Sequence, residues 1–341
     1  MDLLLTVWES DSIQIQWGMG DGSFSETQSL ATDFRPAFIE SSDTNRDSIP
    51  DLVVLDVEGE LHVSLGSGGR SFEDFSPLSN IASADEFSIS DFNSDGNDDI
   101  VIINELASAS EVYINQPDGS FSLSTSLDSP FAPENLQVDD LNMDGSSDVE
   151  ISNKFEVRIF HGDVSGGFVR AASLFETNVF AYGVAFGDIN GDSIKDVVIS
   201  DAGNEYTLYL SSGSEYIGSS RVFDTPTTDS FVILTTMEMV DMNGDGHLDL
   251  VGVANSLVVA FGDGAGNFSV VRFGSESQSP FYVCGDDSDF RSESVLNLAD
   301  LNGDDILDAV TFNERWSTIS YSPGLPNSFA GARPGTNTEF E

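Results

Sequence analysis

The chain has 341 residues and a formal net charge of −47, from 59 acidic and 12 basic residues. Such a charge disfavours nucleic acids and anionic membranes as partners, because binding to either depends on clustered Lys and Arg. Hydrophobic residues make up 39% of the chain and include 25 Phe, so we expect a packed core rather than disorder.

The N-terminal segment already shows the pattern that dominates the chain. "LLLTV" from Leu3 and "SIQIQW" from Ser12 are short runs of apolar, β-branched and aromatic residues bounded by polar turns, which is typical of β-strands. Residues 2–24 align with residues 51–72, which follow an acidic loop. The first unit is therefore expected to lack its own first strand and loop. No ten-residue helical stripe occurs along the chain.

Six acidic loops recur after this segment, and their starting points are separated by 48, 49, 48, 53 and 59 residues. A short strand precedes each loop, as in "EFSIS" from Glu86. Two strands and a glycine-rich turn follow it, as in "DIVIIN" from Asp99, "EVYIN" from Glu111 and "QPDGSF" from Gln116. Four short antiparallel strands in each unit of this length predict the blades of a β-propeller.

We therefore predict an all-β protein, a β-propeller of seven four-stranded antiparallel blades with the first blade incomplete. Six blades or an open ring are the alternatives. Residues 1–329 are expected to form a single propeller domain, and residues 330–341 a flexible C-terminal tail.

The acidic loops carry the clearest chemistry in the chain. Numbered from 1 to 9, every loop has Asp at positions 1, 5 and 9 and Asn at position 3. Three carboxylates in one turn repel one another, and each resists ionisation unless a cation lies among them. Calcium takes roughly six to eight oxygen ligands in irregular arrangements. The predicted ligands are the side chains at positions 1, 3, 5 and 9 and the backbone carbonyl at position 7: Asp43, Asn45, Asp47, Ile49, Asp51; Asp91, Asn93, Asp95, Asn97, Asp99; Asp140, Asn142, Asp144, Ser146, Asp148; Asp188, Asn190, Asp192, Ile194, Asp196; Asp241, Asn243, Asp245, His247, Asp249; and Asp300, Asn302, Asp304, Ile306, Asp308.

Position 6 of each loop must bend sharply, which favours glycine. Glycine occupies it in the loops that begin at Asp91, Asp140 and Asp241, so these rank first as candidate sites, while the other loops carry Ser or Asp there. An EF-hand does not fit, because it requires Glu at position 12 and flanking helices.

These loops, their spacing and the β-rich runs around them resemble the FG-GAP or VCBS repeat family, best known from the calcium-binding propellers of integrin α subunits. The resemblance extends from Asp2 to about Phe329. It implies that each loop joins the first and second strands of a blade and binds calcium, up to six ions in all. It also implies that ligands bind the opposite face, which is built by the turns between second and third strands and by the loops between blades.

Those turns are mostly acidic, with Lys154 and Arg315 as exceptions. Trp8 and Trp316 lie in the first and last of them and would either contact a ligand or seal the ring. The longer segments 213–237 and 277–294 would either shape specificity or be neutral insertions.

Several residues are expected to be structural rather than functional. Trp17 aligns with core positions, and Cys284 is expected to be a buried apolar residue. The three histidines fall in different units, so they are not expected to converge on an acid–base site. Glu150 occupies a position held by Val53 and its equivalents, and is either a local irregularity or a partly buried carboxylate.

The leading functional hypothesis is a monomeric, non-enzymatic, calcium-stabilised module of the extracellular space or cell surface that recognises a protein or glycan. Extracellular calcium is abundant enough to fill even weak sites. The alternative is a polysaccharide lyase or glycosidase. Its carboxylate pair cannot be located among 59 acidic residues, and no basic cluster suited to a lyase is visible. The N-terminus lacks the features of a signal peptide, and no apolar run predicts membrane insertion.

Overall fold

The computed structural model of the chain describes residues 2–7, 10–19, 24–25, 27–117, 119–129, 132–171, 175–176, 181–201, 205–213, 216–224, 236–253, 257–273, 294–299, 308–313, 318–322 and 338–340. Within these ranges the chain forms strands and turns and contains no α-helix. Accordingly, no helix in the described ranges is long and apolar enough to span a membrane.

The strands fall into two compact units. The N-terminal unit comprises residues 2–17 and 24–177, and the C-terminal unit comprises residues 178–341 together with 1 and 18–23.

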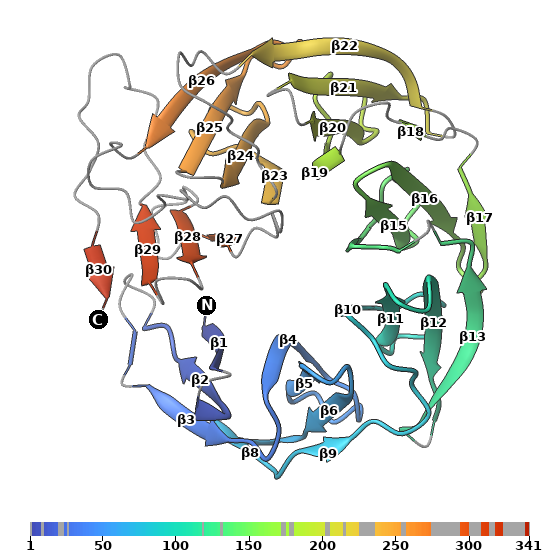
Figure 1. Ribbon diagram of the computed structural model, residues 1–341, viewed down its shortest axis with the longest axis vertical. Helices are drawn as coiled ribbons and strands as arrows, with labels where there is room; N and C mark the ends of the chain where they lie inside the picture. The colour runs from blue at the N-terminus through green and yellow to red at the C-terminus, as the bar shows by residue number, and fades with distance from the viewer. Residues whose placement is uncertain are drawn as a thin grey trace. The chain divides into compact units, whose positions relative to one another are not determined.

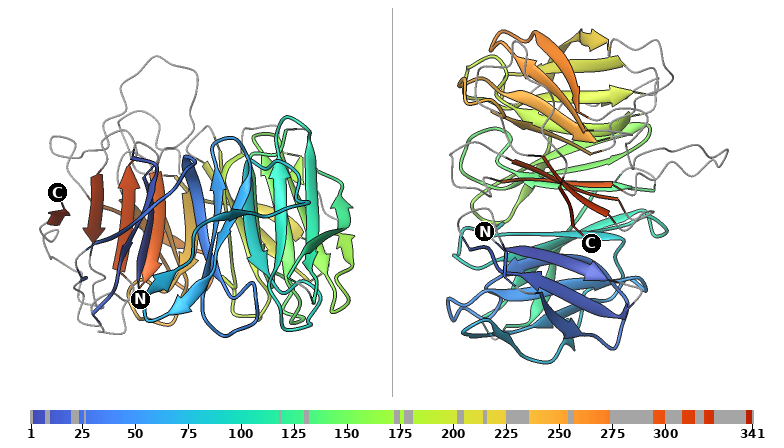
Figure 2. Two further views of the ribbon diagram at one scale, coloured as in Figure 1. Left: turned by 90° about the horizontal axis from the view of Figure 1, so that it is seen from below. Right: turned by 90° about the vertical axis from the view of Figure 1, so that its left-hand side faces the viewer.

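The N-terminal unit contains four main sheets in chain order, and the strands within each are antiparallel to their neighbours (Figures 1 and 2). The first sheet has three strands: β1 (Leu3–Val7), β2 (Ser12–Gln16) and β3 (Gln28–Ala31). The second has β4 (Pro36–Ser42), β5 (Asp51–Asp56), β6 (Leu61–Ser64) and β9 (Ser76–Pro77), and is accompanied by a ribbon of β7 (Gly66–Gly68) and β8 (Ser71–Phe72). The third has β10 (Glu86–Ser90), β11 (Asp99–Asn104), β12 (Ala109–Asn115) and β13 (Phe121–Leu127). The fourth has β14 (Asn135–Asp139), β15 (Asp148–Asn153), β16 (Glu156–Gly162), β17 (Phe168–Arg170) and β18 (Phe175–Glu176).

The C-terminal unit contains three four-stranded antiparallel sheets among its described residues. The first has β19 (Ala181–Gly187), β20 (Asp196–Asp201), β21 (Glu205–Ser211) and β22 (Tyr216–Asp224). The second has β23 (Thr236–Val240), β24 (Asp249–Val253), β25 (Leu257–Gly262) and β26 (Phe268–Phe273). The third has β27 (Ser294–Ala299), β28 (Asp308–Asn313), β29 (Thr318–Ser322) and β30 (Thr338–Phe340).

The hydrophobic cores lie between consecutive sheets, as packing of propeller blades requires. One core joins Leu55 of β5 to Phe87 of β10 and Ile100 of β11. The next joins the opposite face of β11, through Val101, to Val149 of β15. These residues are almost completely buried, and β5 and β11 each contribute to two cores, one on either face. This position between two neighbouring sheets explains why both strands are apolar on both faces.

Five acidic loops join the first and second strands of their sheets, as the sequence predicted. In the third sheet, for example, the loop leaves β10 after Ser90 and enters β11 at Asp99, and these two residues are paired. The all-β fold and its four-stranded antiparallel blades are thus confirmed, and so is a first sheet of only three strands. A count of seven blades in one closed ring stays a prediction, as does the single-domain assignment.

One strand is described in the C-terminal segment 330–341, whose flexibility stays a prediction. Thr338–Phe340 forms β30, which pairs antiparallel with β29, with Tyr321 opposite Thr338. A three-residue strand is too short to show a periodic pattern in sequence. Pairing with the edge strand β29 supplies the backbone hydrogen bonds that define it.

Candidate metal centres

Five of the six acidic loops lie within the described residues. Of the sixth, the structure describes only Asp308, the first residue of β28. The other predicted ligands of that loop lie outside the described residues: Asp300, Asn302, Asp304 and Ile306.

In the second loop, the side-chain oxygens at positions 1 and 3 converge on one backbone N–H. Asp95 N donates to Asp91 Oδ1 at 3.1 Å and to Asn93 Oδ1 at 2.9 Å. The position-5 carboxylate lies beside them, because Asn93 Nδ2 donates to Asp95 Oδ2 at 3.3 Å. The other oxygen of Asp91 accepts from Gly96 N at 2.8 Å. Local hydrogen bonds therefore bring three of the predicted ligands together.

The other four described loops repeat this geometry closely. The N–H of position 5 lies 3.0–3.1 Å from an oxygen of the first Asp and 2.8–3.0 Å from the Asn oxygen. The N–H of position 6 lies 2.8–2.9 Å from the second oxygen of the first Asp. The structure thus brings positions 1, 3 and 5 together in every loop that it describes.

The turn places two residues, not one, in the left-handed region. Position 6 has a positive φ in all five loops, including the two where it is serine, Ser48 at 65° and Ser193 at 68°. Serine therefore adopts the same bend as Gly96, at some cost in conformational energy. Position 4 also has a positive φ, as at Met143 with 61°, and the sequence pattern did not predict this.

Position 9 is held differently from the other three acidic or amide positions. Asp99 is completely buried, and its two oxygens accept Phe92 N at 3.1 Å and Asn115 N at 2.8 Å. In all five loops one oxygen accepts from the N–H of position 2 at 2.9–3.2 Å. The other accepts at 2.8–2.9 Å from the last residue of the third strand or, in the first loop, from Gly66 at the start of β7. This Asp therefore fastens its loop to the blade as well as facing the other carboxylates.

This second backbone donor to position 9 is glycine in three of the five loops, at Gly66, Gly162 and Gly262. A Cβ there would meet the backbone carbonyl oxygen of position 8 at 2.1–2.3 Å. Sequence reasoning missed this element, although a recurring glycine at the start of each glycine-rich turn was a signal for it.

The pKa of the aspartate at position 9 is raised in three of the five described loops. Burial, and secondarily the carboxylates at positions 1 and 5, raise the pKa of Asp99 to about 6, although its two backbone hydrogen bonds oppose the change. The same causes raise the pKa of Asp249 to about 6 and raise that of Asp196. In these three loops the carboxylates are therefore close enough to repel one another.

This donor set fits a hard divalent cation. Carboxylate and amide oxygens converge in a turn of fixed geometry, and a dication would offset both the burial of the position-9 carboxylate and its repulsion by the carboxylates at positions 1 and 5. The side chains at positions 1, 3, 5 and 9 would hold the ion, and position 7 lies in the same turn because its N–H donates to Asp at position 5.

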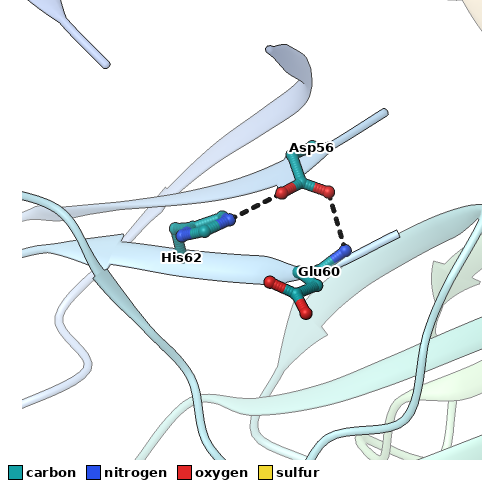
Figure 3. A group of neighbouring side chains, drawn as sticks. All are labelled: Asp56, Glu60 and His62. Carbon is teal, nitrogen blue, oxygen red and sulfur yellow. Dashed lines mark hydrogen bonds and ion pairs between the residues drawn. The ribbon is translucent and has the colours of Figure 1, made fainter. Parts of the chain in front are cut away.

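A second group that could hold a metal lies in the turn between β5 and β6 (Figure 3). One ligand atom from each of Asp56, Glu60 and His62 lies within 4.8 Å of the others. Asp56 is already engaged, because Oδ2 contacts His62 Nε2 at 2.8 Å and Oδ1 accepts Glu60 N at 2.8 Å. Phe34 stacks on the imidazole at a ring-centroid distance of 3.8 Å. These contacts brace the hairpin and leave His62 packed, as expected for a structural histidine.

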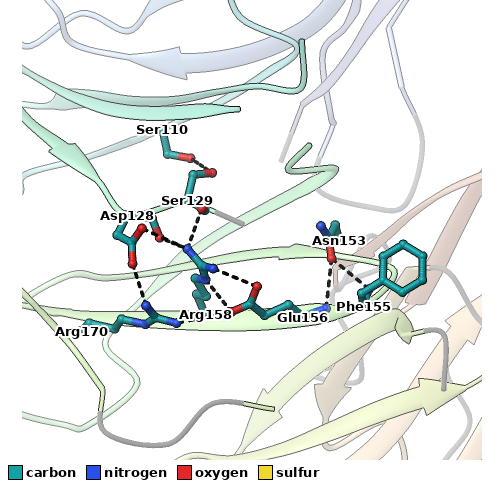
Figure 4. A network of polar contacts seen from close by, with 8 residues as sticks. All are labelled: Ser110, Asp128, Ser129, Asn153, Phe155, Glu156, Arg158 and Arg170. Carbon is teal, nitrogen blue, oxygen red and sulfur yellow. Dashed lines mark hydrogen bonds and ion pairs between the residues drawn. The ribbon is translucent and has the colours of Figure 1, made fainter. Parts of the chain in front are cut away.

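The turns between second and third strands of the N-terminal unit carry exposed apolar residues. Leu106 is 96% exposed, Phe155 62% and Val57 47%. Phe155 stands at the tip of the β15–β16 turn, where Asn153 Oδ1 accepts its N–H (Figure 4).

An ion-pair network lies close to that tip. Arg158 contacts Glu156 at 2.7 Å and Asp128 at 3.3 Å, and Arg170 contacts Asp128 at 2.6 Å (Figure 4). Arg158 also donates to the backbone oxygens of Asp128 and Ser129, so it connects the fourth sheet to the segment that follows β13.

The structure describes some of the remaining residues that the sequence analysis singled out. Trp17 packs beside the core between the first two sheets, as expected. The histidines lie on different elements, His62 on β6, His161 on β16 and His247 in the fifth loop. Outside the described residues lie Trp8, Trp316, Cys284, Arg315, residues 225–235 and residues 277–293.

Comparison with known families identifies the repeats. The FG-GAP-like repeat family matches residues 91–151 and 188–252. Each match begins at the first Asp of one acidic loop, includes the next acidic loop, and ends within the strand that follows it. The chain carries FG-GAP repeats. No curated protein matches its sequence.

Solved structures support the propeller fold of this FG-GAP repeat chain. An Agrocybe aegerita lectin, described for its specific recognition of non-reducing terminal N-acetylglucosamine, has a TM-score of 0.65 at 18% identity, covering 99% of this chain and 89% of the lectin. A Lactobacillus plantarum protein has a TM-score of 0.64 at 10% identity, covering 99% and 95%. BBS1N, solved in complex with ARL6DN, has a TM-score of 0.57 at 11% identity, covering 95% and 91%. At these identities the similarity concerns the fold alone.

Proposed function

We propose that this FG-GAP repeat protein is a calcium-stabilised, non-enzymatic binding module that works outside the cytoplasm and recognises a glycan or protein ligand. The observation that carries the proposal is the repeated convergence of positions 1, 3 and 5 in five loops, each with a buried position-9 carboxylate beside them. Up to six ions, one in each loop, would neutralise these clusters. Abundant extracellular calcium suits sites built in exposed turns.

The ions have a structural role in this proposal. Each ion would hold a turn whose position-9 Asp is hydrogen-bonded to the rest of its blade. The ions therefore stabilise the blades and do not bind the ligand. Ligand recognition belongs to the opposite turns, which offer exposed apolar side chains such as Leu106 and Phe155 beside hydrogen-bonding groups. Aromatic rings with adjacent polar groups suit both sugar rings and protein anchors. The similarity in fold to a glycan-binding lectin supports glycans as the first class to test.

The test is a glycan array probed with the whole chain in calcium and in EDTA, together with a reducing-sugar assay on the same glycans. We expect binding without turnover, and weaker binding in EDTA because the blades loosen. Phe155→Ser should reduce binding, whereas Leu123→Ser, which removes a 52% exposed apolar residue from β13, should not. Release of reducing ends would establish the polysaccharide-active alternative instead. Binding that both variants retain would show that the ligand uses another surface.

A further inference from the structure

The first and second acidic loops are joined by a chain of buried hydrogen bonds inside the N-terminal unit. Asp51, at position 9 of the first loop, accepts from Thr44 N at 2.9 Å and from Thr44 Oγ1 at 2.5 Å. Thr44 O accepts Asn115 Nδ2 at 3.0 Å. Asn115 N in turn donates to Asp99, at position 9 of the second loop, at 2.8 Å. Asp51, Thr44, Asn115 and Asp99 are 0%, 7%, 1% and 0% exposed.

Further contacts join the same two loops. Asn115 Nδ2 also lies 3.2 Å from Asp98 O, and Asn115 O accepts from Arg46 at 3.4 Å. Ser42, the residue before the first loop, donates to Asp98 Oδ2 at 2.6 Å. The two loops therefore share a polar interface that includes positions 2 and 4 of one loop and positions 8 and 9 of the other.

Asn115 is unusual for its place in the blade. The equivalent residues that donate to position 9 are Gly66, Gly162, Ser211 and Gly262. The Asn115 side chain is buried, and its Oδ1 has no hydrogen-bond partner among the described residues. An unpaired buried oxygen is costly, and glycine would avoid that cost. The asparagine instead supplies the contact from the second loop to the first.

We propose that Asn115 couples the first two loops, so that calcium in one raises the calcium affinity of the other. This inference rests on the calcium binding proposed above. Ion binding at the second loop fixes Asp99, which holds Asn115, and Asn115 fixes Thr44 between the position-1 and position-3 ligands of the first loop. The first ion already orders the residues that both loops share, so the second ion binds with a smaller loss of conformational entropy. This gives positive cooperativity. The effect is reciprocal, because a coupling free energy acts equally on both sites.

The test measures hydrogen exchange of the peptide spanning residues 43–51 as a function of calcium concentration. In wild type its protection should develop at a lower calcium concentration than in Asp95→Ala, which disables the second loop. We expect the midpoint to rise about fivefold or more in that variant. Asn115→Gly should raise it similarly, and combining the two substitutions should add little.

Asn115→Gly and Asn115→Ser install residues that equivalent positions already carry, so the backbone donor to Asp99 is retained. Ser211→Gly is the matched control, because it makes a similar change beside the fourth loop, and it should leave the midpoint for residues 43–51 unchanged. Protection of residues 241–249 verifies that each variant is folded and binds calcium.

Three results would overturn the coupling. Calcium-dependent protection with midpoints within about twofold of wild type in Asp95→Ala would show independent loops while leaving calcium binding intact. A calcium midpoint for residues 43–51 that rises in Asp95→Ala but in neither Asn115 variant would show that other residues couple the two loops. Protection that never depends on calcium, in any loop, would remove the proposed function together with this inference.

Discussion

The position-9 aspartates are predicted both to accept backbone hydrogen bonds within the blade and to bind calcium. Stability measured without calcium distinguishes the first contribution from the second. Asp99 accepts two backbone hydrogen bonds in a completely buried position, whereas Asp95, in the same loop, is exposed. Both are predicted calcium ligands. In EDTA, where no ion is bound, Asp99→Ala should destabilise the protein strongly and Asp95→Ala only slightly.

The magnitude follows from the groups left unpaired. Alanine at position 99 leaves Phe92 N and Asn115 N without their acceptor, and each buried unsatisfied donor costs about 1–3 kcal/mol. The sum is about 2–6 kcal/mol. Burial also raises the pKa of Asp99, so removing the carboxylate relieves a desolvation cost and places the net loss in the lower half of that range. For the exposed Asp95 we expect less than about 1 kcal/mol.

The assay is urea unfolding followed by far-ultraviolet circular dichroism at pH 8 in EDTA, with wild type, Asp95→Ala, Asp99→Asn and Asp99→Ala side by side. Asparagine keeps one acceptor, so Asp99→Asn should fall between wild type and Asp99→Ala. Calcium should then stabilise wild type more than either alanine variant. Equal stability of Asp95→Ala and Asp99→Ala in EDTA would refute the anchoring role of position 9.

Three further predictions concern residues outside the loops. Burial raises the pKa of Glu40 from 4.5 to about 7, so ionisation of this residue favours the unfolded chain and stability falls as the pH rises from 4.5 to 7. Glu40→Gln should therefore have the same urea midpoint as wild type near pH 4 and a higher one at pH 8. A difference in urea midpoint that is the same at both pH values would contradict this. Glu150 is completely buried, and burial raises its pKa to about 8, so Glu150→Val should stabilise the protein by about 1–3 kcal/mol at pH 7 in urea unfolding. A loss of stability would show that the carboxyl group is needed. Gly162→Ala would place a Cβ 2.2 Å from Ser147 O and should cost about 1–3 kcal/mol by the same assay, with the open Gly119→Ala as a smaller reference.

Much of the fold could be predicted because its determinants are local and repeated. The strand–loop–strand order follows from short apolar runs around loops of fixed composition, and positions 1, 3 and 5 converge through hydrogen bonds that span only two to five residues. Such short-range contacts are specified by the motif itself.

The parts that sequence reasoning missed depend on contacts across the blade or between blades. Asp99 meets the N–H of Asn115, 16 residues along the chain, and Asn115 meets Thr44, 71 residues away. The pairing of β30 with β29 is likewise set by an edge strand and not by local pattern. Glu150 was noticed as an exception among valines, but its complete burial depends on packing that no single strand reveals.

Calcium content is the most direct test of the central claim that the six loops are ion sites. The whole chain is dialysed to equilibrium against buffered calcium, and the bound metal is measured per chain by elemental analysis, beside Asp95→Ala. We predict several ions, up to six, for wild type and one fewer for the variant. A wild-type protein that retains no calcium above the buffer level would contradict the account.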